Sequence, residues 1–196
     1  QIQSVGNEET YESDVEDPAV IDLELHYFAN RVAKRLRKYG LMGHTVSIKV
    51  RYKDFKTVSR QKRLDSSTDQ ERVIYDTSVL LWNKLMRDAL SAKQEEQEVM
   101  GATPRPKFDN SILEVPVKPI RLLGVTVSGL STEAVVQDDL FSIEADEKDE
   151  KLSIMLDSLA SKFGEEAIMS GALWRRAHGD GGERRKRSEL KAEIDL

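Results

Sequence analysis

The side chains best suited to chemistry in this sequence are cations that alternate with apolar residues along one short segment. Lys49, Arg51 and Lys53 are each separated by a single residue, and the hydroxyl residue Ser47 precedes them. Successive side chains of a β-strand point to opposite sides, so these residues would share one face. The other face would be apolar, with Val46, Ile48, Val50 and Tyr52. Such a strand could neutralise phosphate groups on one side and pack into a core on the other.

Residues 55–64 add cations and hydroxyl groups that we expect on the same basic face. The cations are Arg60, Lys62 and Arg63, and the interleaved hydroxyl residues are Thr57 and Ser59. The two segments together predict a sheet with one basic face, which is suited to a phosphate backbone.

The flanking sequence predicts the elements that position these strands. Residues 2–13 and 119–130 have strand character, the latter because it is rich in β-branched residues and ends at a turn. Residues 19–39 repeat apolar side chains three or four apart, which predicts an amphipathic helix. The pair Asp17-Pro18 would start this helix and Gly40 would end it.

A second helix is predicted over residues 70–92, after a capping segment at 66–69. Its expected buried stripe comprises Val73, Ile74, Thr77, Leu80, Leu81, Leu85 and Met86. Residues 94–117 contain three prolines and are predicted to form a loop.

The order of these elements predicts an α+β fold. Its centre would be a four-stranded antiparallel sheet (β-α-β-β-α-β) with two helices on one face, followed by a flexible C-terminal tail with a short helix. We expect a folded domain at 1–131, an acidic linker at 132–150, a tail helix at 151–173 and a disordered end at 174–196.

The net charge of -5 hides a strong asymmetry along the chain. Residues 31–72 carry thirteen Lys or Arg against four acids, whereas residues 1–30 carry eight acids and no Lys or Arg. Residues 131–171 carry three Lys against eleven acids. The middle of the chain is therefore the part that would attract a polyanion.

Several classes of site are disfavoured by composition. The sequence has no cysteine, which excludes disulfides and fits a cytoplasmic location, and its three histidines lack ligand-like spacing. The acidic run 146–150 lacks the glycine and spacing of a calcium loop, so no metal site is predicted. No apolar run is long enough for a membrane helix, so no membrane partner is expected. Because the first residue is Gln1, we expect a fragment of a longer protein.

Four blocks of this sequence resemble a known domain. Ser4–Tyr11, Val32–Gly40, Val46–Thr57 and Ile120–Leu130 occur in this order in the little-finger domain of Y-family translesion DNA polymerases, the DNA polymerase IV and Gram-positive mutagenesis polymerase type. The resemblance covers about residues 1–131, and the Gly-Val-Thr-Val-Ser-Gly-Leu ending at Leu130 is its most distinctive part.

This resemblance implies a sheet backed by two helices that holds damaged or primed duplex DNA beside a separate catalytic core. That core carries the palm domain and its Mg²⁺; nothing in this chain resembles it, so the fragment alone would have no cofactor and would not transfer nucleotides. The DNA contacts implied by position, without base specificity, are Ser4, Gly6, Thr10, Lys49, Arg51, Lys53, Thr57, Ser59, Arg60, Lys62, Arg121, Thr126 and Ser128. Glu8 and Glu9 depart from this pattern because they bring negative charge to a strand that would face phosphate.

A short segment after the domain resembles a second family feature. Gln137-Asp-Asp-Leu-Phe141 is similar to the pentapeptide by which bacterial polymerases hold the DNA polymerase III sliding clamp. In this resemblance Leu140 and Phe141 would fill an apolar pocket and Gln137 would make a polar contact at its rim.

Two other functions remain open at this point. An RNA-binding module has a similar order of strands and helices, but such modules stack bases on aromatic residues of their central strands. A non-catalytic protein-interaction adaptor would make the basic face incidental. Binding of duplex DNA that weakens steeply with salt would distinguish the polymerase interpretation from the adaptor.

Overall fold

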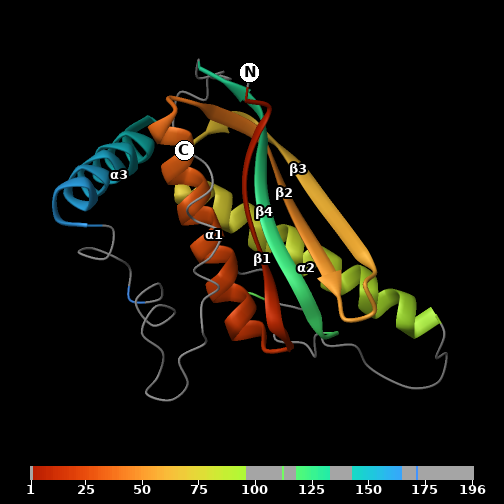
Figure 1. The fold of residues 1–196 in the computed structure, drawn as a ribbon. Coiled ribbons are helices and arrows are strands. Elements are labelled where there is room, and N and C mark those ends of the chain that lie inside the picture. Colours follow the sequence, from red (N-terminus) through yellow and green to blue (C-terminus); the bar gives the residue numbers. More distant parts are fainter. Residues whose placement is uncertain (1, 96–111, 113–117, 133–142, 165–170, 172–196) are drawn as a thin grey trace.

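The computed structural model describes residues 2–95, 112, 118–132, 143–164 and 171. Within these described residues, seven elements follow one another (Figure 1). They are β1 (Ser4–Val15), α1 (Pro18–Lys38), β2 (Met42–Tyr52), β3 (Thr57–Thr68), α2 (Glu71–Glu95), β4 (Ile120–Ser131) and α3 (Ile143–Phe163). The expected disordered end, the pentapeptide expected to bind a clamp and nearly all of the expected loop at 94–117 lie outside the described residues.

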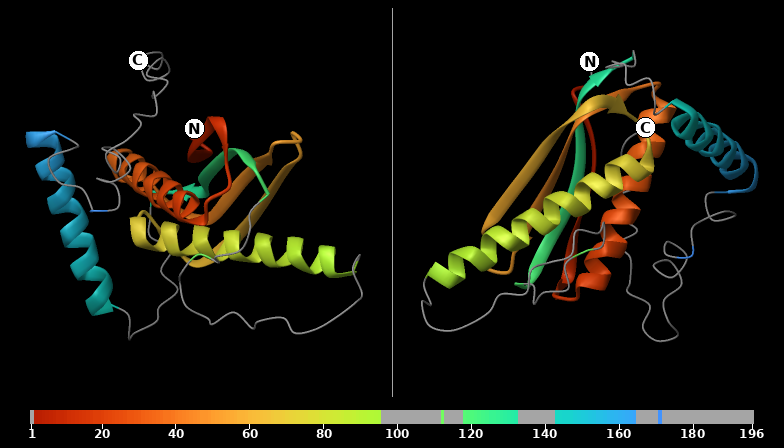
Figure 2. Two further views of the ribbon diagram at one scale, coloured as in Figure 1. Left: turned by 90° about the horizontal axis from the view of Figure 1, so that it is seen from below. Right: turned by 180° about the vertical axis from the view of Figure 1, so that it is seen from behind.

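The four strands form one antiparallel sheet in the order β1-β4-β2-β3. Helices α1 and α2 both lie against the same face of this sheet (Figure 2). The predicted α+β architecture is therefore confirmed. We call the opposite side of the sheet, which these two helices do not cover, the open face.

Helix α1 begins and ends where its sequence predicts. The side chain of Asp17 accepts a hydrogen bond of 2.9 Å from the backbone N–H of Ala19, and Pro18 occupies the first helical turn. Gly40 follows the helix with a φ of 61°, a conformation that glycine adopts without steric cost.

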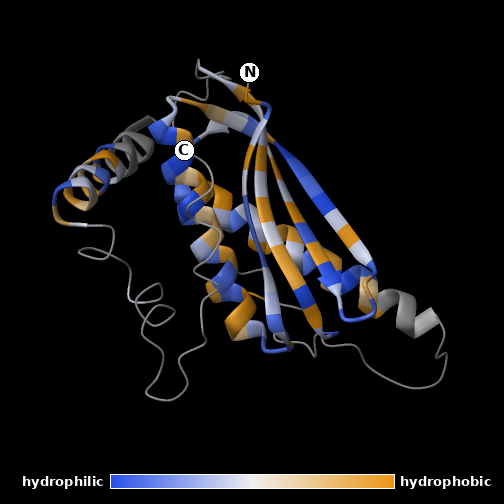
Figure 3. Ribbon diagram, viewed as in Figure 1, coloured by the Kyte–Doolittle hydropathy of each residue, from blue (hydrophilic) through white to orange (hydrophobic). Residues whose placement is uncertain are grey.

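The core lies between the helices and the inner face of the sheet. Alternate residues of the two central strands, β2 and β4, supply apolar side chains to it, which gives the banded pattern of Figure 3. Trp82 of α2 and Phe28 of α1 are the largest fully buried side chains. The stripe predicted for α2 is buried at five of its seven positions, but Val73 and Leu80 are exposed.

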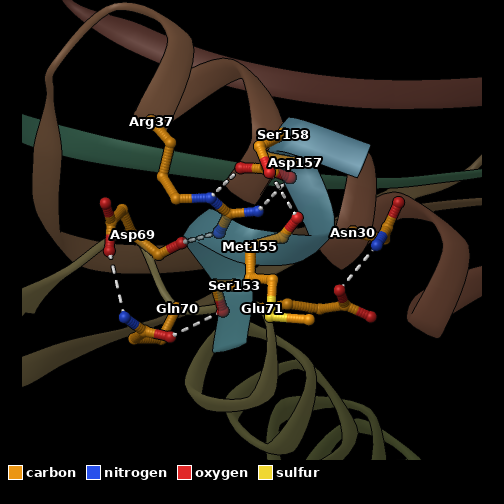
Figure 4. A network of polar contacts seen from close by, with 9 residues as sticks. All are labelled: Asn30, Arg37, Asp69, Gln70, Glu71, Ser153, Met155, Asp157 and Ser158. Carbon is orange, nitrogen blue, oxygen red and sulfur yellow. Dashed lines mark hydrogen bonds and ion pairs between the residues drawn. The ribbon is translucent and has the colours of Figure 1, made fainter. Parts of the chain in front are cut away.

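Helix α3 contacts the rest of the molecule through polar groups (Figure 4). The Arg37 guanidinium donates to both carboxylate oxygens of Asp157, at 2.5 and 3.1 Å, and to the backbone carbonyl of Asp69 at 3.0 Å. The helix begins at Ile143, inside the segment expected to be an acidic linker, and ends before residue 173. Five of its large apolar residues are exposed, namely Leu152, Ile154, Met155, Leu156 and Phe163, whereas Leu159 is half-buried.

No helix within the described ranges is long and apolar enough to cross a membrane.

Candidate nucleic-acid interface

The strand register arranges the open face as four rows that run across the sheet from β1 to β3. Each row takes one residue from β1, β4, β2 and β3 in turn, because residues paired in register point to the same side. The rows are Ser4–Ser128–Thr45–Arg63, Gly6–Thr126–Ser47–Gln61, Glu8–Gly124–Lys49–Ser59 and Thr10–Leu122–Arg51–Thr57. Nine of the predicted contact residues lie in these rows: Ser4, Gly6, Thr10, Lys49, Arg51, Thr57, Ser59, Thr126 and Ser128.

The cations of β2 lie on the open face, as the alternation of the strand predicts. Val46, Ile48 and Val50 are at most 1% exposed against the helices. The side chain of Lys49, which lies between Ile48 and Val50 in the sequence, is 41% exposed, and Arg51 is half-buried. Lys53 follows the end of β2, and its side chain is 71% exposed.

Two of the predicted residues of β3 lie on the other face. Arg60 pairs in register with the buried Ile48, and Lys62 pairs with the buried Val46. The guanidinium of Arg60 also donates to the carboxylate of Asp88 on α2, at 3.1 Å. The expectation that Arg60 and Lys62 share a face with Thr57 and Ser59 is wrong, because even and odd positions of a regular strand point to opposite sides.

The two halves of the open face differ in chemistry. The two rows that begin at Ser4 and Gly6 are mostly hydroxyl and glycine residues, with Arg63 and Gln61 at their β3 ends. Gly6 lies close to its neighbour here, since a Cβ at Gly6 would come within 2.6 Å of Thr126 Oγ1. These rows offer hydroxyl groups for hydrogen bonds to phosphate oxygens. The other two rows carry Lys49 and Arg51, the cations of this face of β2.

The carboxylate of Glu8 lies among the two rows that carry Lys49 and Arg51. The sequence alone did not predict which cation it would meet. Glu8 Oε2 is 2.5 Å from Lys49 Nζ, although β4 separates their two strands. Asp14 likewise lies 3.6 Å from Lys53. The sequence shows that residues 8–17 are acidic, but which cations these acids contact follows only from the strand register. The cations of the open face are thus partly neutralised from within the molecule.

The hairpin between β2 and β3 brings further charges to one end of the sheet. Lys118 donates to Asp54 at 2.6 Å, and this hydrogen bond holds the pKa of Asp54 below its usual value. Burial raises the pKa of Tyr52, which faces the core, although Lys118 and Arg60 nearby act in the opposite direction. The predicted contact residue Arg121 lies over the ring of Phe55, with its guanidinium carbon 5.3 Å from the ring centroid.

Among the described residues there is no cluster of three His, Cys, Asp or Glu side chains that could hold a metal ion. Gln137, Leu140 and Phe141 lie outside the described residues. Within the described residues, the candidate interface is therefore the open face of the sheet, which is polar and basic.

Comparison with known proteins identifies the family. The model of the impB/mucB/samB family C-terminal domain matches residues 2–140. The chain belongs to this family. The impB/mucB/samB C-terminal domain thus includes every strand of the sheet and the whole open face.

Relatives of this domain are bacterial DNA polymerases. DNA polymerase IV of Bacillus anthracis is 30% identical over 175 residues, which cover 88% of this chain and 35% of the relative. DNA polymerase IV of Streptomyces coelicolor is 30% identical over 151 residues, 77% of this chain and 25% of the relative. The predicted resemblance to Y-family polymerases is confirmed, and the chain spans about a third of the length of the curated relatives it matches.

Among solved structures, the chain matches a complex of the beta-clamp processivity factor with the little finger domain of PolIV. That match is 16% identical with a TM-score of 0.40, and it covers 70% of this chain and 98% of that one. DinB from Sulfolobus solfataricus is 15% identical with a TM-score of 0.41, over 64% of this chain and 28% of that one.

Proposed function

We propose that this domain binds primer–template DNA without sequence preference through its open face. The observation that supports the proposal is the placement of Lys49 and Arg51 on the side of the sheet that α1 and α2 leave uncovered. A cationic surface flanked by hydroxyl groups and close-lying glycine backbone has the donors that phosphate contacts use.

In this mechanism, Lys49 and Arg51 each neutralise a phosphate and release condensed counterions. Hydroxyl groups of Thr126 and Ser128 add hydrogen bonds along the neighbouring rows, whereas the hydroxyl of Ser47 donates to the carbonyl of Thr126 at 3.3 Å. Contacts to phosphates fix the position of a duplex but carry no sequence information. The domain would therefore bind duplex DNA independently of its base sequence.

We further propose that the parent protein is a translesion DNA polymerase with a role in DNA repair, of which this chain is the C-terminal portion. The relatives that it matches are named DNA polymerase IV, and the first of them is about two and a half times as long as this chain. A catalytic palm domain with Mg²⁺ would come from the part of such a protein that this chain does not cover. The domain would then hold the duplex while nucleotide transfer occurs elsewhere.

The second partner in this proposal is the sliding clamp. Gln137, Leu140 and Phe141 have the residue types and spacing of a clamp-binding pentapeptide and follow the sheet closely in the chain. A tether to a clamp that encircles DNA would raise the local concentration of the domain at the primer end, so two weak contacts would reinforce each other.

An RNA-binding module is a weaker interpretation of the same fold. Such a module needs aromatic side chains on the exposed side of its central strands. The outward residues of β2 and β4 within the four rows are Thr45, Ser47, Lys49 and Arg51, and Leu122, Gly124, Thr126 and Ser128. None of these is aromatic, and Tyr52 is 7% exposed on the core side.

The deciding experiment measures binding of a blunt fluorescent duplex by anisotropy over a range of salt concentrations. We expect log K to fall linearly with log salt, with a slope of about 0.9 per neutralised phosphate. The double variant K49E/R51E should lose binding at moderate salt. The matched control, R60E/K62E, reverses two charges on the helix side and should retain most of the affinity.

Absence of duplex binding by the unaltered chain at low salt would refute the proposal. Equal weakening by both double variants would show that overall charge rather than the open face attracts DNA. Circular dichroism of each variant would verify that the fold is retained.

A further inference from the structure

The hairpin that joins β2 to β3 contains an unusual residue at its turn. The backbone N–H of Phe55 donates to the carbonyl of Tyr52 at 2.9 Å, and the N–H of Tyr52 donates to the carbonyl of Lys56 at 3.0 Å. Within this turn Phe55 has a φ of 64°, and no other non-glycine residue in the described part of the chain has a positive φ. Glycine is the usual residue at such a left-handed hairpin position, because a Cβ there is sterically unfavourable.

Packing does not explain why this position carries a phenylalanine. The residue is 67% exposed, so its ring contributes little to the core. A large apolar side chain that is both exposed and in a left-handed conformation contributes less to folding than a glycine would at the same place. The ring is therefore a candidate for a role in binding.

Cations outnumber acids around the ring, although Asp54 precedes Phe55 and pairs with Lys118, and Asp14 lies 3.6 Å from Lys53. Arg121 lies over Phe55 at 5.3 Å from the ring centroid, a distance at which a guanidinium attracts an aromatic face. Lys53 and Lys56 flank Phe55 closely in the turn, and both are exposed. The turn also adjoins the open face directly, because Thr57, two residues later, pairs with Arg51 in the last of the four rows.

We propose that Phe55 is a stacking platform for an unpaired nucleobase of a single strand that extends from the duplex. This inference rests on the proposed binding of duplex DNA by the open face and adds a separate contact at its end. An exposed aromatic ring stacks on any base, and neighbouring Lys and Arg side chains hold the adjacent phosphates. Arg121 positions the ring, and Lys53 and Lys56 supply the charge that a single-stranded backbone meets.

The test compares three DNAs with the full 196-residue chain. They are a blunt duplex, the same duplex with a single-stranded extension, and the extension strand alone, with 2-aminopurine as the first unpaired base. The variants are F55L, which removes the aromatic face, and F55Y, which keeps it. The matched control is F163L, because Phe163 is a phenylalanine of similar exposure, 70%, on α3.

We expect the unaltered chain to bind the extended duplex more tightly than the blunt one and to quench 2-aminopurine. F55L should weaken binding of the extended duplex by at least about fivefold, in line with the loss of one base–aromatic stack, and should abolish quenching. Binding of the blunt duplex should be unchanged in F55L, and F55Y and F163L should behave like the unaltered chain.

Two results would overturn the inference while leaving the proposed function intact. One is equal affinity of F55L and the unaltered chain for the extended duplex. The other is equal weakening of blunt and extended duplex by F55L, which would make Phe55 a duplex contact or a structural residue. Failure to bind the blunt duplex at all would instead refute the proposed function. The strand-alone measurement would then still test the stack, and unchanged fluorescence there would refute it.

Discussion

Glu8 and Lys49 lie on strands that are not neighbours, yet their charged groups are 2.5 Å apart on the open face. Strand β4 runs between them, and the residue in register with both is Gly124. Since Gly124 has no side chain, nothing stands between the carboxylate and the ammonium group. A cation proposed to bind phosphate is thus held by an acid of its own domain.

Neutralising Glu8 should therefore strengthen DNA binding. In E8Q, Lys49 no longer has an ionic competitor, and one negative charge leaves the interface. Exposed ion pairs of this kind contribute up to about 1 kcal/mol, so we expect about two- to fivefold tighter binding and a steeper salt dependence. Fluorescence anisotropy with a blunt duplex measures both. The control, D88N, removes the acid that pairs with Arg60 on the helix side and should change affinity little; an equal gain in D88N would contradict the role of Glu8.

A side chain at position 124 should disturb the sheet itself. A Cβ there would come within 2.6 Å of Glu8 Cβ and 3.3 Å of its Cα, so β1 and β4 must shift. We expect G124A to lower the free energy of unfolding by about 1–3 kcal/mol, the usual cost of overpacking. Urea unfolding gives this value directly. At Gly171 a Cβ would meet nothing within 4 Å, so G171A should be nearly neutral; similar losses in both variants would refute the steric explanation.

The contact between α1 and α2 should make stability depend on acid pH. Burial alone would raise the pKa of Glu71, but hydrogen bonds from His26 and Asn30 outweigh it and hold that pKa below its usual value. A carboxyl with a lowered pKa in the folded state stabilises the fold at higher pH, and this contribution is lost as the pH falls below the ordinary Glu value of about 4.3 and through the lowered one. We expect E71Q to be less stable than the unaltered chain at pH 6 and the difference to shrink by pH 3. Denaturant titrations across this range would contradict the assignment if the gap stayed constant.

Docking of α3 should depend on the Arg37–Asp157 ion pair. The Arg37 side chain is 13% exposed, and its guanidinium donates two hydrogen bonds to Asp157 and one to the carbonyl of Asp69. D157N removes the charge and replaces one of the two acceptor oxygens with an NH₂ group, so one hydrogen bond is lost and the other is weakened. We expect faster amide hydrogen exchange in α3, with exchange in the sheet unchanged. The exposed Lys162 of the same helix provides the control K162Q, and protection of α3 that survives D157N would show that other contacts hold the helix.

Clamp binding, if the pentapeptide provides it, should be separable from DNA binding. The variant L140A/F141A removes the two apolar side chains proposed to fill the clamp pocket. We expect loss of binding to a purified bacterial sliding clamp in surface plasmon resonance, together with unchanged affinity for duplex DNA. The double variant K49E/R51E should give the reverse result. Clamp affinity that persists in L140A/F141A would show that the pentapeptide is coincidental.

The sequence predicted the central strands well because their two faces differ so clearly. In β2 the apolar and polar residues alternate without interruption from Val46 to Tyr52. This alternation assigns each residue either to the core or to the open face. Edge strand β3 offers no such signal, because Ser59 to Arg63 is polar on both sides. The sides of Arg60 and Lys62 follow only from their pairing with buried residues of β2.

Other features depend on information that a single sequence does not carry. The acidic run at 144–150 reads as a solvated linker, but negative charge near a helix N-terminus is favourable, and α3 includes it. The pairing of Glu8 with Lys49 requires the register of three strands at once. The conformation of Phe55 is likewise invisible in composition, since glycine is the residue expected in such a turn.

The docking of α3 also sets a limit on how far any protein bound to the pentapeptide could stand from the sheet. Strand β4 ends at Ser131 and α3 begins at Ile143, so Gln137–Phe141 comes between these two elements in the chain. Phe141 is two residues from the start of α3, a covalent reach of about 7 Å. A partner that binds Phe141 would therefore stay close to α3. The short length of the intervening chain would also restrict the orientation of this partner relative to the DNA.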